Sequence, residues 1–133
     1  MAQLGSLLPQ KEKIKSSFRV KEEAEIAAKL APKDPTTQHF LGRWCFAVAS
    51  IGWLERKAAA LIFAKPPEST YEEALKFFLA ADALEDNFKR NAMWVGDTYK
   101  ALGKKVEAVE WYKTAVDMPF AEVVRICFAC SLL

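Results

Sequence analysis

Apolar residues recur along this chain every three or four positions, which is the period of an amphipathic α-helix. The few β-branched residues fall within the same period, so we predict an all-α protein. Prolines, glycines and one Asp-Asn pair interrupt this pattern and divide the chain into segments. The predicted helices are residues 11–30, 34–67, a helix that starts at 69 and ends before a turn at 86–87, 89–102 and 106–116.

The segment 34–67 predicts one greatly lengthened helix. Asp34 can accept a hydrogen bond from an orphan backbone N–H, and Pro35 is tolerated in a first helical turn. The pair Pro66-Pro67 cannot continue a helix. The glycines inside the segment cost only about 1 kcal/mol each. We therefore expect an uninterrupted helix roughly 45 Å long.

The other boundaries have their own signals. Ser69 and Glu72 have the spacing of a capping box at a helix start. Gly103 and Pro119 predict the ends of the last two helices. Residues 1–10 contain Pro9 and are expected to form a flexible N-terminus, which leaves residues 11–133 as one helical domain.

Small and bulky residues repeat at the positions where paired helices touch in a tetratricopeptide unit of about 34 residues. The contact positions of one regular unit are Ala92, Val95, Gly96 and Tyr99, followed by Ala108, Tyr112 and Ala115. An expanded unit has Leu41, Gly42 and Cys45, and then, after about twenty inserted residues, Ala74, Phe78 and Ala81. We predict tetratricopeptide-like antiparallel hairpins stacked in a right-handed superhelix, with a partial unit upstream.

Composition narrows the function classes. With 133 residues, 52% of them hydrophobic and 27% charged, the chain can form one domain with a core. A net charge of +2 gives no support for nucleic-acid binding. Three cysteines form no even disulfide framework and no signal-peptide pattern is visible, so we expect a cytosolic protein. No apolar run reaches the roughly 18 residues of a transmembrane segment.

Catalytic chemistry finds little support. His39 is the single histidine and has no partner at catalytic or metal-ligand spacing. Cys127 and Cys130 have redox spacing, but a second ligand pair and a βαβ context are missing, so packing is expected. The sequence has no phosphate loop, nucleophile elbow or catalytic carboxylate pair. We predict no enzyme, no catalytic residue, no metal and no cofactor.

Six short segments carry a resemblance to one family. They are LGRWCF (41–46), WLERK (53–57), FAKPP (63–67), ST (69–70), EAL (73–75) and FLAA (78–81). The stretch 11–119 resembles the C-terminal tetratricopeptide-like domain of the regulator of microtubule dynamics proteins. That resemblance implies a microtubule-associated protein of the cytoplasm, spindle and spindle poles that affects chromosome segregation. The apolar ending at 121–133 departs from the more polar closing helix expected there, and its Phe128, Leu132 and Leu133 could drive self-association.

First-helix residues opposite the contact positions are expected to line a binding groove. The candidates are His39, Arg43, Phe46, Lys57, Arg90, Met93 and Lys100. This face would be cationic because it carries Arg43, Lys57, Arg90 and Lys100. A cationic face suits an acidic surface or acidic tail of tubulin. The Lys-Asn-Arg clamp of chaperone-binding repeats is not reproduced.

Two alternatives remain open at this point. A phospholipid could bind between apolar residues of the long helix: Phe46, Val48, Ile51, Leu61, Ile62 and Phe63. Trp44 and Trp53 are expected to be core residues rather than a binding box. A general peptide-binding adaptor is the other alternative.

Overall fold

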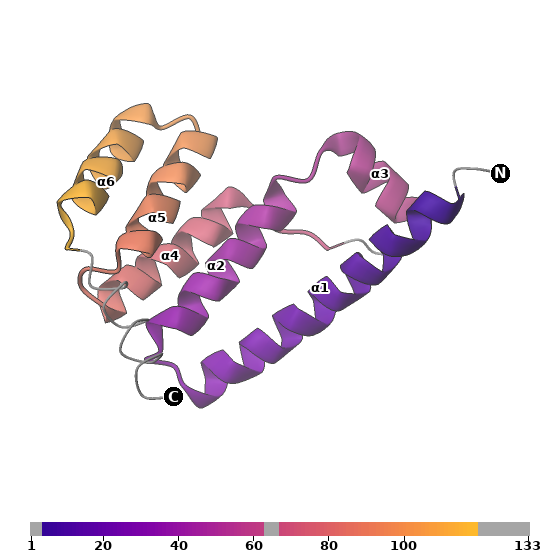
Figure 1. Ribbon diagram of the computed structural model, residues 1–133, viewed down its shortest axis with the longest axis horizontal. Helices are drawn as coiled ribbons and strands as arrows, with labels where there is room; N and C mark the ends of the chain where they lie inside the picture. The colour runs from indigo at the N-terminus through magenta and orange to yellow at the C-terminus, as the bar shows by residue number, and fades with distance from the viewer. Residues whose placement is uncertain (1–3, 63–66, 120–133) are drawn as a thin grey trace.

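The computed structural model describes residues 4–62 and 67–119, and these residues form six helices without a strand (Figure 1). The helices are α1 Leu4–Leu30, α2 Pro35–Ala49, α3 Trp53–Ile62, α4 Tyr71–Leu84, α5 Lys89–Ala101 and α6 Lys105–Asp117. The predicted all-α class is confirmed. No helix in the described part of the chain is long and apolar enough to cross a bilayer.

The first helix is longer than the sequence suggested. It begins at Leu4 and includes Pro9, although we had expected a helix only from residue 11. Proline at this position removes one backbone hydrogen bond, and the helix continues on both sides of it. Trp44 on α2 donates from Nε1 to the carbonyl and the hydroxyl of Ser17, at 3.1 and 2.8 Å, and so ties α1 to α2.

The predicted single helix over 34–67 is wrong. Helix α2 ends at Ala49, Ser50 is its C-cap, and α3 begins at Trp53. The hydroxyl of Ser50 donates to the Ala47 carbonyl at 2.8 Å. The guanidinium of Arg56 on α3 reaches the carbonyls of Val48 and Ala49 at 3.4 Å each. Side chains therefore satisfy carbonyls that a continuous helix would have paired, and the chain turns at Gly52.

The hairpins pair as the repeat pattern predicted. Helix α2 packs on α4, and α5 packs on α6, while α4 and α5 join the two hairpins and α1 lies along α2. Figure 1 shows α3 off the end of α2, away from α5 and α6. The inserted residues therefore interrupt the α2–α4 connection without entering the hairpin. The superhelical arrangement stays a prediction.

Helix starts differ between the two hairpins. Asp34 caps α2 as predicted, accepting from the backbone N–H groups of Thr36 and Thr37. The capping box of α4 is Thr70 with Glu73, one residue later than predicted. The shift arises because the Ser69 hydroxyl donates to the Glu73 carboxylate at 2.6 Å instead of capping Glu72. The N-caps of α5 and α6, Phe88 and Lys104, make no side-chain cap bond.

The turns between the later helices follow the sequence signals. Asn87 has a φ of 67° in the turn before α5, and Gly103 has a φ of 79° in the turn between α5 and α6. Asparagine and glycine are the residues that most readily adopt this left-handed conformation. The predicted turn at 86–87 and the predicted end at Gly103 are confirmed.

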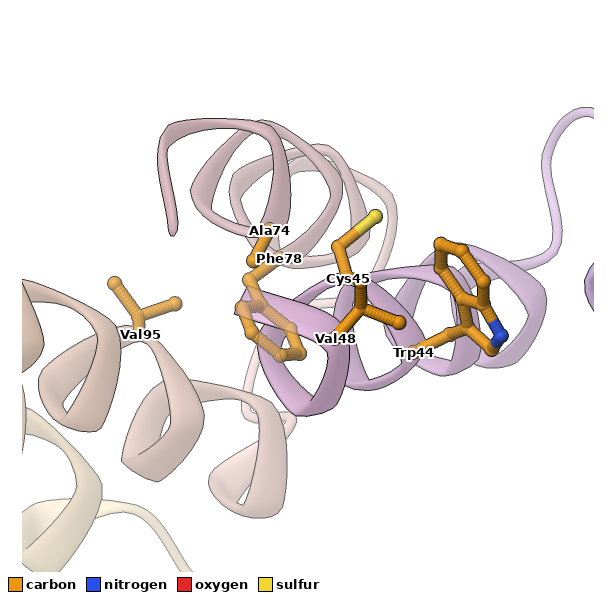
Figure 2. Close-up of a cluster of buried hydrophobic side chains, with 6 residues drawn as sticks. All are labelled: Trp44, Cys45, Val48, Ala74, Phe78 and Val95. Carbon is orange, nitrogen blue, oxygen red and sulfur yellow. The ribbon is translucent and has the colours of Figure 1, made fainter. Parts of the chain in front are cut away.

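The core lies between α2, α4 and α5. Its buried members are Trp44, Cys45, Val48, Ala74, Phe78 and Val95. Figure 2 shows the Phe78 ring between the α2 ribbon and the side chain of Val95. A Cβ atom on Gly42 would lie 2.7 Å from that ring, which is why α2 needs a glycine there. Trp44 and Cys45 are core residues as predicted.

Some predictions fall outside what the structure describes. The side chain of Trp53 and the segment with Cys127, Phe128, Cys130, Leu132 and Leu133 lie outside the described residues. Burial raises the pKa of the remaining cysteine thiol, Cys45, and so disfavours its reactive thiolate form.

Candidate functional site

An aromatic cluster reaches the surface where α2, α4 and α5 meet. Phe46 on α2 meets Trp94 on α5 with ring centroids 5.2 Å apart, edge to face. Phe46 also meets Tyr71, the first residue of α4, at 5.2 Å. Trp94 stacks on the buried Phe78 at 6.0 Å. The indole of Trp94 is thus fixed on the core side and half-buried.

A cation covers this aromatic cluster. The guanidinium of Arg43 lies over the Trp94 ring, with its central carbon 5.0 Å from the ring centroid. Arg43 and Phe46 are three residues apart on α2, so they share one helix face. We call the set Arg43, Phe46, Tyr71 and Trp94 the Arg43–Trp94 surface.

The geometry leaves the charge of Arg43 available. Arg43 is exposed, and within residues 4–62 and 67–119 it forms no ion pair. A guanidinium that lies over an aromatic ring can still donate its N–H groups, and a carboxylate can accept two of them. The Arg43–Trp94 surface therefore presents an exposed guanidinium with aromatic rings beside it.

His39 does not belong to this surface, and its prediction as a groove residue is wrong. It is only 6% exposed. Its ring lies between Phe88, 4.9 Å away, and Phe78, 5.5 Å away. The amide of Asn91 donates to the Phe78 carbonyl at 2.7 Å, and its Oδ1 accepts from His39 Nδ1 at 2.9 Å. His39 and Asn91 thus join α2, α4 and α5 from the inside.

The remaining groove candidates are exposed, but the structure does not bring them all together. Arg90, Met93 and Lys100 are exposed residues of α5, and Arg90 and Met93 are within about one turn of Trp94. Asp97 on the same helix accepts from the Tyr112 hydroxyl at 2.6 Å and so faces α6. Lys57 is exposed on α3, and the break before α3 removes the single helix that was to carry it to the groove.

The apolar residues considered for a lipid site have different surroundings. Val48 is buried in the core and Phe46 belongs to the Arg43–Trp94 surface, whereas Leu61 on α3 is 90% exposed. Ile51 lies in the break between α2 and α3 and is half-buried. The placed members of this set therefore do not line one wall. Phe63 lies outside the described residues.

Sequence reasoning missed two members of the surface and the partner of His39. Trp94 lies between the helix contact positions Ala92 and Val95, and a bulky aromatic beside such positions was the available signal. Asn91 inside a helix was a second signal, because asparagine is a poor helix former and is kept there when its amide has partners. Tyr71 had no comparable signal.

Comparison with known proteins gives a consistent result. Residues 1–123 match the family model described as Regulator of microtubule dynamics protein 1-3. The chain is 43% identical over 110 residues to Regulator of microtubule dynamics protein 1 of Bos taurus, covering 82% of this chain and 35% of that protein. It is 39% identical over 108 residues to Regulator of microtubule dynamics protein 3 of Mus musculus, covering 80% of this chain and 23% of that protein. The chain thus spans about a third or less of these relatives.

Proposed function

Because the chain belongs to the regulator of microtubule dynamics family, we propose that it is a non-catalytic microtubule-associated protein that binds tubulin through the Arg43–Trp94 surface. The names of its relatives support a role connected with microtubules. The observation that carries the choice of surface is the exposed guanidinium of Arg43 held over Trp94.

The proposed partner is an acidic segment of tubulin, such as its acidic tail. Its carboxylates would pair with the N–H groups of Arg43, while the rings of Phe46 and Tyr71 receive apolar atoms of the same segment. Cations Arg90 and Lys100 on α5 add positive charge that speeds and orients the encounter. Such contacts are screened by salt, so binding should weaken as ionic strength rises.

Co-sedimentation with microtubules tests this proposal. We expect the protein to pellet with microtubules at low salt and to pellet less after the acidic tails are removed enzymatically. Arg43→Gln should weaken binding about three- to fivefold, as the loss of one exposed ion pair predicts. Arg19→Gln, an exposed arginine on α1, removes the same charge and serves as the matched control.

Two outcomes would contradict the proposal. One is no pelleting at low salt, and the other is equal binding to intact and tail-free microtubules. Equal losses for Arg43→Gln and Arg19→Gln would reject the Arg43–Trp94 surface while leaving a general electrostatic attraction in place.

The proposal extends to location and to cell division. We expect the protein on cytoplasmic microtubules, on the spindle and at spindle poles, with an effect on chromosome segregation. A fluorescent fusion should mark these structures, and the same fusion with Arg43→Gln should mark them more weakly. A diffuse wild-type signal in dividing cells would count against this extension.

A further inference from the structure

A separate pocket lies at the other end of the hairpins and has the opposite charge. It measures about 430 Å³ and opens where the end of α4, the turn before α5 and the end of α6 meet. Its lining residues are Asp82, Asp86, Asn87, Glu110, Trp111, Thr114 and Met118. The lining thus contains three carboxylates and one indole, and it contains no cationic side chain.

The half-buried carboxyl of Asp82 has no cationic side chain beside it among the lining residues of the pocket. Asp82 is half-buried, and in the described part of the chain its side chain makes no hydrogen bond or ion pair. Burial, and then the negative charge of Asp86, raise the pKa of Asp82 above its ordinary value. A carboxylate in such surroundings gains free energy when a cation enters.

The backbone adds to this preference. The C-terminal ends of both α4 and α6 lie at the pocket, and a helix carries partial negative charge at its C-terminal end. One ammonium group of the chain is already bound at the end of α6: Lys89 Nζ donates to the carbonyl of Met118 at 3.3 Å. The rim of the pocket therefore binds a cation in the folded protein itself.

The indole selects among cations. Trp111 packs partly against the core, so one part of it is fixed while another part lines the pocket. A planar guanidinium can stack on an indole and still donate to carboxylates at its edge, whereas an ammonium acts as a point charge. The volume of the pocket is enough for one long side chain, and its open side admits a chain from outside.

We propose that this pocket, formed by Asp82, Asp86, Glu110 and Trp111, binds an arginine side chain of a basic peptide segment in a partner protein. The guanidinium stacks on Trp111 and donates to Asp82 and Asp86, with Glu110 beside it. The domain then has two docking sites of opposite charge, so it can hold an acidic partner and a basic partner at the same time.

Fluorescence anisotropy with a labelled peptide tests this site on the whole chain. The probe is a short Gly/Ser peptide with two arginines, and its control has citrulline at both positions, which keeps the shape and removes the charge. We expect the arginine peptide to bind at least tenfold more tightly than the citrulline peptide. Equal binding of the two peptides would overturn the proposal.

A pair of charge-matched variants locates the binding. The pocket variant is Asp82→Asn, Asp86→Asn and Glu110→Gln, and the control variant removes three exposed carboxylates of α1, Glu12→Gln, Glu22→Gln and Glu23→Gln. The pocket variant should lose at least tenfold in affinity, and the control should stay within twofold. Equal losses would show nonspecific attraction, and no loss in the pocket variant would exclude the pocket.

A third variant separates stacking from charge. Trp111→Phe keeps a ring against the core and weakens the cation–π contact, so we expect about fivefold weaker binding, with a small fall in Tm that leaves the protein folded at the temperature of the assay. The pocket variant should be at least as stable as the wild type, because it removes a poorly solvated charge. Its microtubule binding should not weaken, because the variant loses negative charge only, so failure of this site and failure of the proposed tubulin site give different results.

Discussion

The two hairpins use one type of helix contact but differ in what connects and caps them. Gly42 of α2 lies against the ring of Phe78 on α4, and Gly96 of α5 lies against the ring of Tyr112 on α6. The α5–α6 connection covers residues 102–104, whereas the α2–α4 connection covers residues 50–70 and includes α3. The comparison shows that the glycine-on-ring contact defines a hairpin here, and that the length of the connection does not.

The same two contacts differ in how much room their rings have. Phe78 has no exposed surface and touches both His39 and Trp94. Tyr112 is half-buried, and its hydroxyl reaches Asp97. Burial and hydrogen bonding by Asp97 raise the pKa of Tyr112 to about 12. One glycine therefore faces a fully enclosed ring, and the other faces a ring that is partly open to solvent.

The largest expected effect comes from a substitution that disrupts the contact between Gly42 and Phe78. A methyl group on Gly42 must displace the Phe78 ring, so Gly42→Ala should lower the free energy of unfolding by about 2 kcal/mol, even with the gain in helix propensity. Gly96→Ala should cost less than half as much, because the Tyr112 ring is partly exposed and has solvent on one side into which it could shift. Urea unfolding measures both.

Gly52→Ala is the control for that pair, because nothing lies within 4 Å of the added atom. It should change the free energy of unfolding only slightly. Equal losses for Gly42→Ala and Gly96→Ala would show that the two rings are equally constrained, which is the opposite of our expectation.

A smaller effect concerns the caps, which only the α2–α4 hairpin has. Asp34→Ala should lower the free energy of unfolding by about 1 kcal/mol at pH 7. The Thr37 hydroxyl, and then the backbone N–H groups of Thr36 and Thr37, keep the pKa of Asp34 below its ordinary value of 3.8. A lowered pKa stabilises the fold above pH 3.8, and this contribution is lost as the pH falls through the pKa of the folded state.

The difference between Asp34→Ala and the wild type should therefore shrink below about pH 4. Thermal unfolding between pH 2.5 and pH 7 measures it. Glu23→Ala on the exposed side of α1 is the control and should stay within about 0.5 kcal/mol of the wild type. A constant difference across this pH range would mean that the Asp34 carboxylate does not provide the cap.

The smallest expected effect comes from a substitution that adds a side-chain cap to α6, which has none. Lys104 is the N-cap of α6 and makes no side-chain cap bond. Lys104→Asp should raise the free energy of unfolding by about 0.5–1 kcal/mol, because aspartate can accept from the first backbone N–H groups and its charge suits this helix end. Lys104→Ala is the control, and an equal gain for alanine would contradict capping as the cause.

The sequence predicted the hairpin pairing well because the pattern of small and bulky contact residues depends only on helix period. It failed at residues 50–52. A single Gly52 costs too little to end a helix by itself, and the bonds of Ser50 and Arg56 that stabilise the break appear only in three dimensions. The capping box shifted by one residue because Ser69 and Thr70 are adjacent and both can cap.

The candidate site was predicted in part. Arg43 and Phe46 could be predicted from their positions on α2. The ring that both of them contact, Trp94, belongs to α5, about fifty residues further along the chain. His39 was misplaced for a related reason. Its burial depends on Phe88 and Asn91 of the next hairpin, and no local pattern of α2 contains them.

The inserted connection has a consequence for the order in which the chain folds. Before α2 and α4 can pair, the chain must close a loop with about seven times as many residues as the loop between α5 and α6 (50–70 against 102–104), which costs on the order of 1–2 kcal/mol more entropy. We therefore expect α5 and α6 to pair first and to serve as the surface on which α4 and then α2 assemble. Pulsed hydrogen exchange would show amide protection in α5 and α6 before α2, and the reverse order would refute this nucleus.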